Sequence, residues 1–296
     1  KMQPDKARQL ILAECIGSLF VETSTLKLEK VPLLYGTGAN GKSVYFDTVN
    51  ALLGGEANVS SYTLQQLTDE NGYYRAKLGN KLVNYASEIN GKMDASIFKA
   101  LASGEPISAR LPYGEPFTLT RYAKLMFNAN ELPREVEQTD AFFRRFLLIP
   151  FDVSLPEAEW DRGLGARIAA NELSGVFNWA LAGLHRLLKQ QGFTESQAVN
   201  DALQVFRRRS DSVRSYLEEE GYTPSADSHR PLKDVYQAYR EYCKEGGAHP
   251  VGRNNFGERL RGAGYQVTRS GGVRSVWLEK GVTDEKAVAD ETDMPF

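Results

Sequence analysis

The sequence predicts an α/β fold in which helices flank a parallel sheet and a small winged-helix domain follows. Three observations predict it. An apolar run, a glycine-rich turn and a helix start follow one another within 31–50. Further apolar stretches at 81–86, 125–129 and 141–151 have the character of buried strands, and strands that alternate with helices form parallel sheets. Towards the C-terminus, two helical stretches precede two short strands, which is the element order of a winged helix.

Composition limits the class of protein. The chain has 296 residues, of which 42% are hydrophobic and 25% charged, as in a soluble globular protein of one large domain or two modest ones. No apolar run is long enough to span a membrane and no signal peptide opens the chain. The cysteines, Cys15 and Cys243, are too few for a disulfide framework or a zinc site, so a cytoplasmic location is expected. The net charge of −2 excludes a uniformly basic nucleic-acid binder but allows a local basic patch.

The elements expected in the N-terminal half follow from apolar spacing and from glycine and proline breaks. They are a helix over 5–20, a strand over 28–35, a helix over 43–53, a helical stretch over 62–78 broken at Asn71-Gly72, a strand over 81–86, a helix over 95–102, a β-hairpin over 107–122 that turns at Pro112-Tyr113-Gly114, and strands over 125–129 and 141–151. The chain begins with Lys1-Met2, which suggests a piece cut from a longer protein.

In the C-terminal half, 157–191 has the spacing of an amphipathic helix. Its expected buried face consists of Phe177, Trp179, Leu181, Leu184, Leu187 and Leu188. A helix over 200–220 and a polar loop over 223–229 follow, then helices over 232–244 and 253–262 and two short strands around Gly271. We therefore expect five parts: an N-terminal helical segment (1–30), the α/β core (31–155), a helical extension (156–222), a winged-helix-like domain (223–281) and an acidic, disordered tail (282–296).

The glycine-rich turn predicts a phosphate-binding loop. Gly36–Ser43, with the sequence GTGANGKS, matches G-x-x-x-x-G-K-[ST] between a strand and a helix. In such a loop the backbone N–H groups and the helix start hold phosphates, the lysine reaches the β- and γ-phosphates, and the serine hydroxyl binds Mg²⁺. The alternative is a chance glycine turn. The expected nucleotide contacts are Gly36, Thr37, Gly38, Ala39, Asn40, Gly41, Lys42, Ser43 and Val44, with ATP and Mg²⁺ as cofactors.

Polar residues stand near the ends of the other expected strands. Glu88 follows the second strand, where an acid could order Mg²⁺ or polarise water, and Asn130 follows the third, where an amide could hold that water. Arg144 and Arg145 precede the fourth strand, and an arginine there could neutralise transition-state charge in a neighbour's site. Taken singly, each has a plainer explanation: a solvated acid, a turn asparagine and a solvated basic face.

Together with GTGANGKS, the stretches ASEING, SGEPISARLPYGEPF, NANELP and FFRRFLLIPF resemble the superfamily 3 helicase core of phage, plasmid and satellite primase–helicases, relatives of the poxvirus type. The resemblance is strong over 5–151 and looser beyond. It implies an AAA+-like core, with Lys42 and Ser43 as the Walker A pair and Glu88 as Walker B. It also implies that Asn130 is sensor 1 and that Arg145, with Arg144 as second candidate, is the arginine finger.

The resemblance also implies that the 107–122 hairpin grips DNA in a central pore. Two departures matter. A single acid, Glu88, stands where many relatives have two, and the hairpin tip lacks the lysine of some relatives. DNA contact would then come from Tyr113, which can stack on a base, and from flanking cations. The cations are Arg110, Arg121 and Lys99.

The C-terminal domain is basic. Between 251 and 280, six basic residues stand against two acidic ones, a net charge of +4. A helix from Arg253 followed by a hairpin that carries Arg269 and Arg274 suits a recognition helix and a wing on duplex DNA. The alternative is a winged helix used only for subunit packing. After Gly281, five acids and one lysine precede Phe296, and this end resembles the tip of bacterial single-stranded-DNA-binding proteins. We expect it to recruit host proteins that read such tips, unless it is an ordinary acidic tail.

These features predict an ATP-dependent replicative DNA helicase. An arginine finger far from its own loop is useful only to the next subunit, so a ring, expected to be a hexamer, follows. The family resemblance implies 3′-to-5′ translocation and an upstream primase or polymerase module. The rival hypothesis is a DNA-binding initiator or partition protein in which ATP acts as a switch without unwinding. A small-molecule kinase is a third hypothesis, although the sequence has no motif for an acceptor site.

Overall fold

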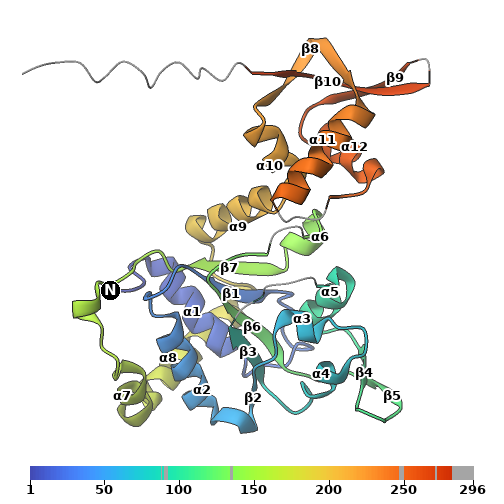
Figure 1. Ribbon diagram of the computed structural model, residues 1–296. Coiled ribbons are helices and arrows are strands. Elements are labelled where there is room, and N and C mark those ends of the chain that lie inside the picture. Colours follow the sequence, from blue (N-terminus) through green and yellow to red (C-terminus); the bar gives the residue numbers. More distant parts are fainter. Residues whose placement is uncertain (88, 90–92, 134–135, 247–249, 271, 282–296) are drawn as a thin grey trace, which may run out of the picture. The chain divides into compact units, whose positions relative to one another are not determined.

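A computed structural model describes residues 1–87, 89, 93–133, 136–246, 250–270 and 272–281. The chain divides into two compact units, Lys1–Arg207 and a second unit that begins at Arg208 (Figure 1). The expected boundary at 222/223 therefore falls earlier in the chain. The cause is α10 (Ser212–Glu219), which was expected to belong to the helical extension but buries Val213, Tyr216 and Leu217 in the core of the second unit.

The first unit contains a parallel sheet of five strands in the order β2-β3-β6-β1-β7. The strands are β1 (Val31–Tyr35), β2 (Val59–Ser60), β3 (Val83–Ser87), β6 (Lys124–Ala129) and β7 (Phe146–Pro150). β6 lies between β1 and β3, with Tyr35 beside Ala129 and Ser87 beside Asn128. The parallel α/β prediction is confirmed. The edge strand β2 was not predicted, because its two residues are too few to form a recognisable apolar pattern.

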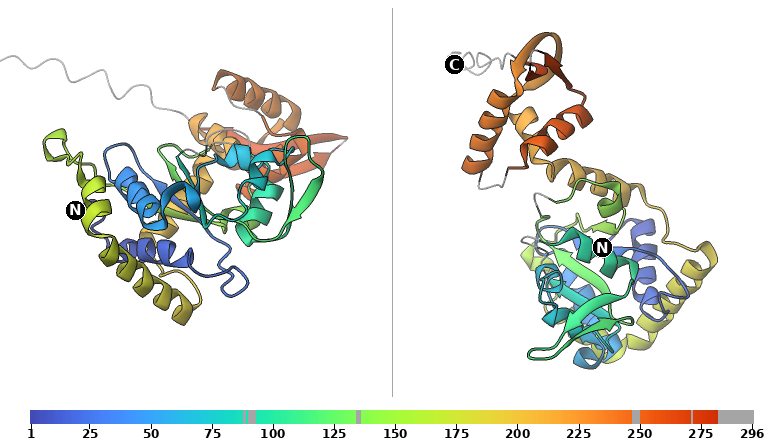
Figure 2. Two further views of the ribbon diagram at one scale, coloured as in Figure 1. Left: turned by 90° about the horizontal axis from the view of Figure 1, so that it is seen from below. Right: turned by 90° about the vertical axis from the view of Figure 1, so that its right-hand side faces the viewer.

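Helices cover both faces of this sheet (Figures 1 and 2). Side chains alternate along each strand, so that Leu34, Met126 and Ile149 pack on one face while Leu33, Phe127 and Leu148 pack on the other. The first face is covered mainly by α1 (Lys6–Ser18), α2 (Lys42–Leu53) and α8 (Leu173–Gln190), and the second by α3 (Leu64–Leu67), α5 (Ala95–Ser103), α6 (Asp140–Phe143) and part of α9 (Gln197–Arg209). Both faces are buried, which explains why these strands are apolar throughout.

The stretch expected as one strand over 141–151 divides into two elements. Its first residues form the short helix α6, whose cap is the Thr139 side chain, which accepts a hydrogen bond from Phe142 N. The strand β7 begins only at Phe146. Likewise, the helical stretch expected over 62–78 consists of α3 and a separate short helix, α4 (Tyr73–Ala76).

The predicted buried face of α8 is wrong. Phe177, Trp179, Leu181 and Leu188 are exposed in the described structure, whereas Ala180, Gly183 and Leu187 are buried. Of the six predicted residues, Leu187 is buried and Leu184 is half-buried. α8 packs closely on α1 through small residues, since a Cβ on Gly183 would lie 2.4 Å from the backbone carbonyl of Ala13. Such close contact requires small residues at the crossing, so the large apolar side chains of α8 point elsewhere.

We expect Gly183→Ala to destabilise the first unit by about 2 kcal/mol or more, because the added methyl group would overlap the α1 backbone. In a unit of this size the melting temperature should fall by roughly 4–8 °C. Gly175→Ala is the matched control, since no atom lies within 4 Å of a Cβ at that position of the same helix. Its melting temperature should be unchanged or slightly higher. Equal melting temperatures for the two variants would contradict the close crossing.

A two-stranded antiparallel hairpin, β4 (Ile107–Arg110) and β5 (Pro116–Leu119), extends from this unit as predicted. Buried Arg75 on α4 holds it in place, because its Nε donates to Ser108 O at 3.0 Å and its Nη1 to Leu67 O at 3.0 Å. The hairpin is therefore anchored at its base while its tip, around Tyr113, is exposed.

The second unit has the order α10, β8 (Tyr222–Pro231), α11 (Leu232–Glu245), α12 (Arg253–Gly262), β9 (Gln266–Ser270) and β10 (Val273–Lys280). The strands form an antiparallel sheet in the order β8-β10-β9. The two helices and the final hairpin were predicted, but the polar loop expected over 223–229 is strand β8. Its side chains are mostly exposed, so it shows no apolar alternation, and only its pairing with β10 makes it a strand. Within the described residues, no helix has the length and apolar character needed to cross a membrane.

Candidate nucleotide site

The glycine-rich loop lies between β1 and α2, as predicted. Gly41 has a φ of 85° and is the N-cap residue of α2, which has no side-chain cap. A Cβ on Gly36 would lie 2.3 Å from Phe151 O, whereas no atom lies within 4 Å of one on Gly38. The loop is thus tightly packed at its start and open at Gly38. The uncapped N–H groups at the helix start are suited to an anion.

Lys42 is 6% exposed and points back into the loop. Its Nζ donates to Gly36 O at 2.5 Å and to Asn40 Oδ1 at 3.0 Å. Burial lowers the pKa of Lys42, because the charged form loses its hydration. Among the described residues, neutral oxygens alone compensate the ammonium group. Phosphate oxygens would solvate it better, so the arrangement favours an anionic ligand.

Asn40 braces the loop, a role that the sequence did not reveal. Its Nδ2 donates to Thr37 O and, at 3.1 Å, to Phe151 O, while its Oδ1 accepts from Lys42. Asn40 is buried, so its side chain holds the loop rather than facing a ligand. The sequence could not predict this role, because the acceptor is the backbone carbonyl of Phe151, which any residue at that position would supply.

Most of the other expected loop residues are accessible to solvent. The exposed residues are Thr37, Gly38, Ala39 and Ser43. Val44 is half-buried in the first turn of α2. Ser43 can supply one oxygen ligand to Mg²⁺, an ion that commonly keeps several of its waters. Among the described residues no group of three or more His, Cys, Asp or Glu side chains could hold a metal. The second predicted metal ligand, Glu88, lies outside the described residues.

The carboxyl ends of three neighbouring strands come together beside this loop. Because Tyr35 pairs with Ala129 and Ser87 with Asn128, the loop after β1, Asn130 after β6 and the end of β3 lie at one edge of the sheet. Asn130 is exposed. The nearby Asn128 is buried and accepts a hydrogen bond from Tyr85 Oη at 2.8 Å, so it belongs to the core. The sheet therefore brings the predicted loop and Asn130 to the same edge.

The two arginines have opposite environments. Arg145, the preferred finger in the sequence, is only 7% exposed. Its guanidinium donates to Lys99 O at 3.2 Å, to Ser103 Oγ at 3.0 Å and to Ala141 O. The side chain of Arg144 is 63% exposed and lies 3.8 Å from Glu29. The Arg145 side chain is thus hydrogen-bonded inside the unit, and Arg144 is the more exposed of the two arginines.

The residues expected to contact DNA differ in availability. Tyr113 is fully exposed at 103% with a φ of 61°, and exposed Arg110 braces the turn by donating from Nε to Gly114 O at 2.9 Å. The Nζ of Lys99 donates to both carboxylate oxygens of Glu137 at 3.0 Å. The pKa of Glu137 is lowered mainly by the hydrogen bond from Thr139 and further by the one from Lys99. Arg121 is exposed and 3.7 Å from Glu22. The hairpin tip is therefore the most accessible part of this set.

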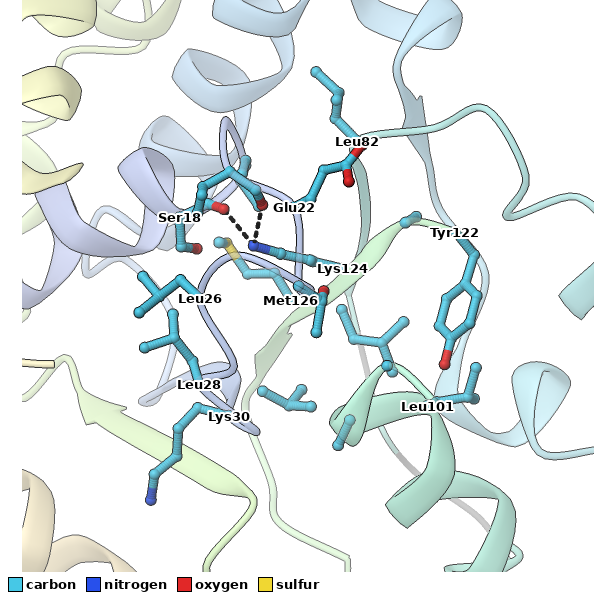
Figure 3. A pocket seen from close by; sticks show the side chains of 18 of the residues that line it. Ser18, Glu22, Leu26, Leu28, Lys30, Leu82, Leu101, Tyr122, Lys124 and Met126 are labelled. Carbon is cyan, nitrogen blue, oxygen red and sulfur yellow. Dashed lines mark hydrogen bonds between the residues drawn. The ribbon is translucent and has the colours of Figure 1, made fainter. Parts of the chain in front are cut away.

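A cavity of about 770 Å³ lies at the other edge of the sheet, where β1 and β6 begin (Figure 3). Lys124 projects into it, and its Nζ donates to Ser18 O at 2.5 Å and to Val21 O at 2.7 Å, next to the last turn of α1. Burial lowers the pKa of Lys124 to about 8. Of the predicted site residues only Arg121 lines this cavity. It is separate from the phosphate loop.

In the second unit the expected DNA residues Arg253, Arg269 and Arg274 are all exposed. Arg269 and Arg274 are directly opposite each other in the β9–β10 pair. Arg259, in contrast, donates to Asp211 Oδ1 at 3.1 Å and holds α12 against the start of α10. The described basic residues of this unit thus include both accessible and structural ones.

Comparisons with known proteins find one family model and one relative in sequence. A family model described as "Family of unknown function (DUF5906)" matches residues 34–145, which include the phosphate loop, Asn130 and both arginines. A protein of Acanthamoeba polyphaga mimivirus named "Putative helicase L207/L206" is 23% identical over 276 residues. The match covers 82% of this chain but 28% of that protein, so the chain spans only a minor part of the relative's length.

Two solved structures show a partial likeness. "The A form apo structure of NrS-1 C terminal region-CTR" has a TM-score of 0.48 at 15% identity, and covers 94% of this chain and 76% of that one. "The apo structure of NrS-1 C terminal region (305-718)" has a TM-score of 0.46 at 15% identity, with 91% and 71% covered. The likeness in sequence to the mimivirus protein named as a helicase covers 82% of this chain.

Proposed function

We propose that this chain is the ATP-driven motor of a replicative DNA helicase that works as a hexameric ring. The observation that carries the proposal is buried Lys42, held by neutral oxygens in an open glycine loop at the start of an uncapped helix. The strand order also supports an AAA+-like core of the superfamily 3 type, since β6 separates the loop strand β1 from β3. The similarity to a protein named as a helicase agrees with both.

In the proposed reaction, the loop would hold the phosphates of ATP, and Ser43 would supply its hydroxyl to Mg²⁺, which would offset phosphate charge. Lys42 exchanges its bonds to Gly36 and Asn40 for phosphate oxygens. Glu88 polarises the attacking water and Asn130 helps to orient it. Glu88 has these roles by resemblance alone.

The ring requires a cation that one subunit offers to the next. Exposed Arg144 fits that role, because its only described ionic partner is Glu29 at 3.8 Å, a weak contact that a phosphate could replace. An arginine finger supplied in trans stabilises charge on the transferred phosphoryl group. We propose Arg144 as the finger and Arg145 as the residue that positions the loop before β7.

The second unit is proposed to be a winged helix that binds duplex DNA. Two like charges directly opposite in a sheet, as Arg269 and Arg274 are, destabilise it unless an anion lies between them. DNA phosphates supply such an anion, and Arg253 at the start of α12 would add a contact from the recognition helix. Use of this unit for subunit packing alone is the alternative.

The experiment that tests the function is strand separation. With ATP and Mg²⁺, the chain should separate the strands of a forked DNA duplex. It should also form a ring whose number of subunits native mass spectrometry measures. ATP hydrolysis without strand separation would favour the ATP-switched initiator or partition protein, and phosphorylation of a small acceptor would favour a kinase. Opposite fork polarities would test the 3′-to-5′ direction that the resemblance implies.

We expect the double variant Tyr113→Ala/Arg110→Ala to uncouple the motor. Basal ATP hydrolysis should persist, while stimulation by DNA and unwinding should fall by about tenfold or more, because the exposed ring can stack on a base and such stacking is worth about 1–3 kcal/mol. Glu115→Ala, in the same turn, removes an acid and should not weaken the stimulation. Undiminished stimulation in the double variant would make the hairpin a structural element only.

Other partners stay predictions. Phe296 and the acidic tail lie outside the described residues, so recruitment of host proteins by that tail rests on the sequence alone. An upstream primase module and a cytoplasmic location are likewise expected from the sequence alone.

A further inference from the structure

The segment that follows β7 is held against the phosphate loop. We call residues 151–160 the flank segment. Phe151 N donates to Tyr35 O at 2.7 Å, Leu155 N donates to Ala39 O at 3.2 Å, and Ser154 Oγ donates to Gly38 O at 3.3 Å. Asn40 adds its bond to Phe151 O. The flank segment therefore borders the loop on the side where Gly38 and Ala39 are open.

The flank segment ends in a fixed but uncovered tryptophan. Trp160 Nε1 donates to Leu155 O at 2.8 Å, and Leu155 is itself bonded to Ala39 of the loop. The indole N–H is thus satisfied within the segment, while the side chain remains 44% exposed. A large ring that is held by its polar edge, with its apolar surface in solvent, is suited to accept a flat apolar ligand.

The N-terminal residues reach the same region. The side chain of Met2 lies 3.2 Å from the place that a Cβ on Gly41 would occupy, and Lys1 Nζ lies 3.2 Å from Glu159. Gln3 Nε2 donates to Pro150 O at 2.9 Å, just before the flank segment. The loop is therefore bordered by Met2 and by the flank segment, and these two parts of the chain contact each other through Lys1 and Glu159.

We propose that Trp160 stacks on the base of the nucleotide whose phosphates the loop holds. This rests on the proposed nucleotide site. A base presents a flat π-face, and stacking on an aromatic side chain tolerates every base because each has such a face. The larger face of a purine gives more contact than that of a pyrimidine. The site would thus recognise phosphates through the backbone and Lys42, and a purine base through Trp160.

The test compares ligands with and without a base, on the full chain. Isothermal titration with ATP, ADP and inorganic tripolyphosphate should show that Trp160→Ala raises Kd for both nucleotides about 5- to 100-fold. Kd for tripolyphosphate should stay as in the wild type, and Trp160→Phe should recover most of the nucleotide affinity. The matched control is Trp179→Ala, which removes another exposed tryptophan of the same unit, 39% exposed, and should bind like the wild type.

Fluorescence gives an independent readout, since the chain has three tryptophans. ADP should change the emission of the wild type and of Trp179→Phe and Trp277→Phe, but not that of Trp160→Phe. Unchanged nucleotide affinity in Trp160→Ala, or an equal loss of tripolyphosphate affinity, would overturn the stacking proposal. A wild-type chain that binds neither nucleotide nor tripolyphosphate would instead overturn the nucleotide site itself.

Discussion

Lys42→Ala should lose ATP hydrolysis by at least about 10²–10³-fold, the effect of removing one preorganised charge stabiliser from an active site. In the structure Lys42 is 6% exposed, and among the described residues its ammonium group is compensated by Gly36 O and Asn40 Oδ1. With the γ-phosphate in place, the same group would lie where negative charge develops. Steady-state phosphate release measures the loss, and unwinding should disappear with it.

The fold should survive this change. Lys42 is desolvated without an ionic partner among the described residues, so its removal relieves a burial cost as well as deleting two hydrogen bonds. The melting temperature of the nucleotide-free variant should stay within a few degrees of the wild type. Lys233→Ala, an exposed lysine of the second unit, is the control for a lost positive charge. Hydrolysis that persists in Lys42→Ala would remove the basis of the proposed function.

Arg145→Ala should destabilise the first unit by about 2–4 kcal/mol, since it leaves the oxygens of Lys99, Ala141 and Ser103 without their donor. Arg144→Ala should change stability by no more than about 0.5 kcal/mol, because its side chain is largely in solvent. Chemical denaturation of the two variants measures this contrast. Equal stabilities would mean that Arg145 is not the structural arginine.

The activities should show the reverse order. Arg144→Ala should bind ATP normally and hydrolyse it about 10³-fold more slowly, as the loss of an arginine finger does. Mixing Arg144→Ala with Lys42→Ala subunits should restore part of the activity, because at some interfaces an intact loop meets an intact arginine. If no mixture exceeds its two parents, Arg144 does not act on a neighbour.

Much of the fold was predictable because both faces of the sheet are buried. Strands such as β6 and β7 are apolar throughout, and the glycine loop marks the exit of β1. What the sequence could not reveal were elements made by pairing alone. β8 is exposed along nearly its whole length and is a strand only because β10 lies beside it.

The sequence predicts a site residue well when its side-chain type alone indicates its role. It predicts poorly when the packing around the residue determines that role. Lys42 and Ser43 follow from a motif. Arg144 and Arg145 are identical in type and adjacent, so only packing distinguishes them, and the same holds for the buried face of α8. Small residues at the crossing with α1 select Gly183, whereas hydrophobicity alone favoured Phe177 and Leu181.

Strand β7 connects the proposed arginine finger to the segment that contacts the glycine-rich loop. Arg144 stands just before it, Phe151 just after it, and it pairs with β1 along its whole length, from Phe146 beside Val31 to Pro150 beside Tyr35. At about 3.3 Å per residue, its five residues span roughly 17 Å. In the proposed cycle, a ligand that shifts Asn40, and with it Phe151 O, would act on the end of β7 that lies away from Arg144. In the proposed ring, occupancy of one subunit's loop and the arginine that it offers to the next would thereby be coupled through a single buried strand.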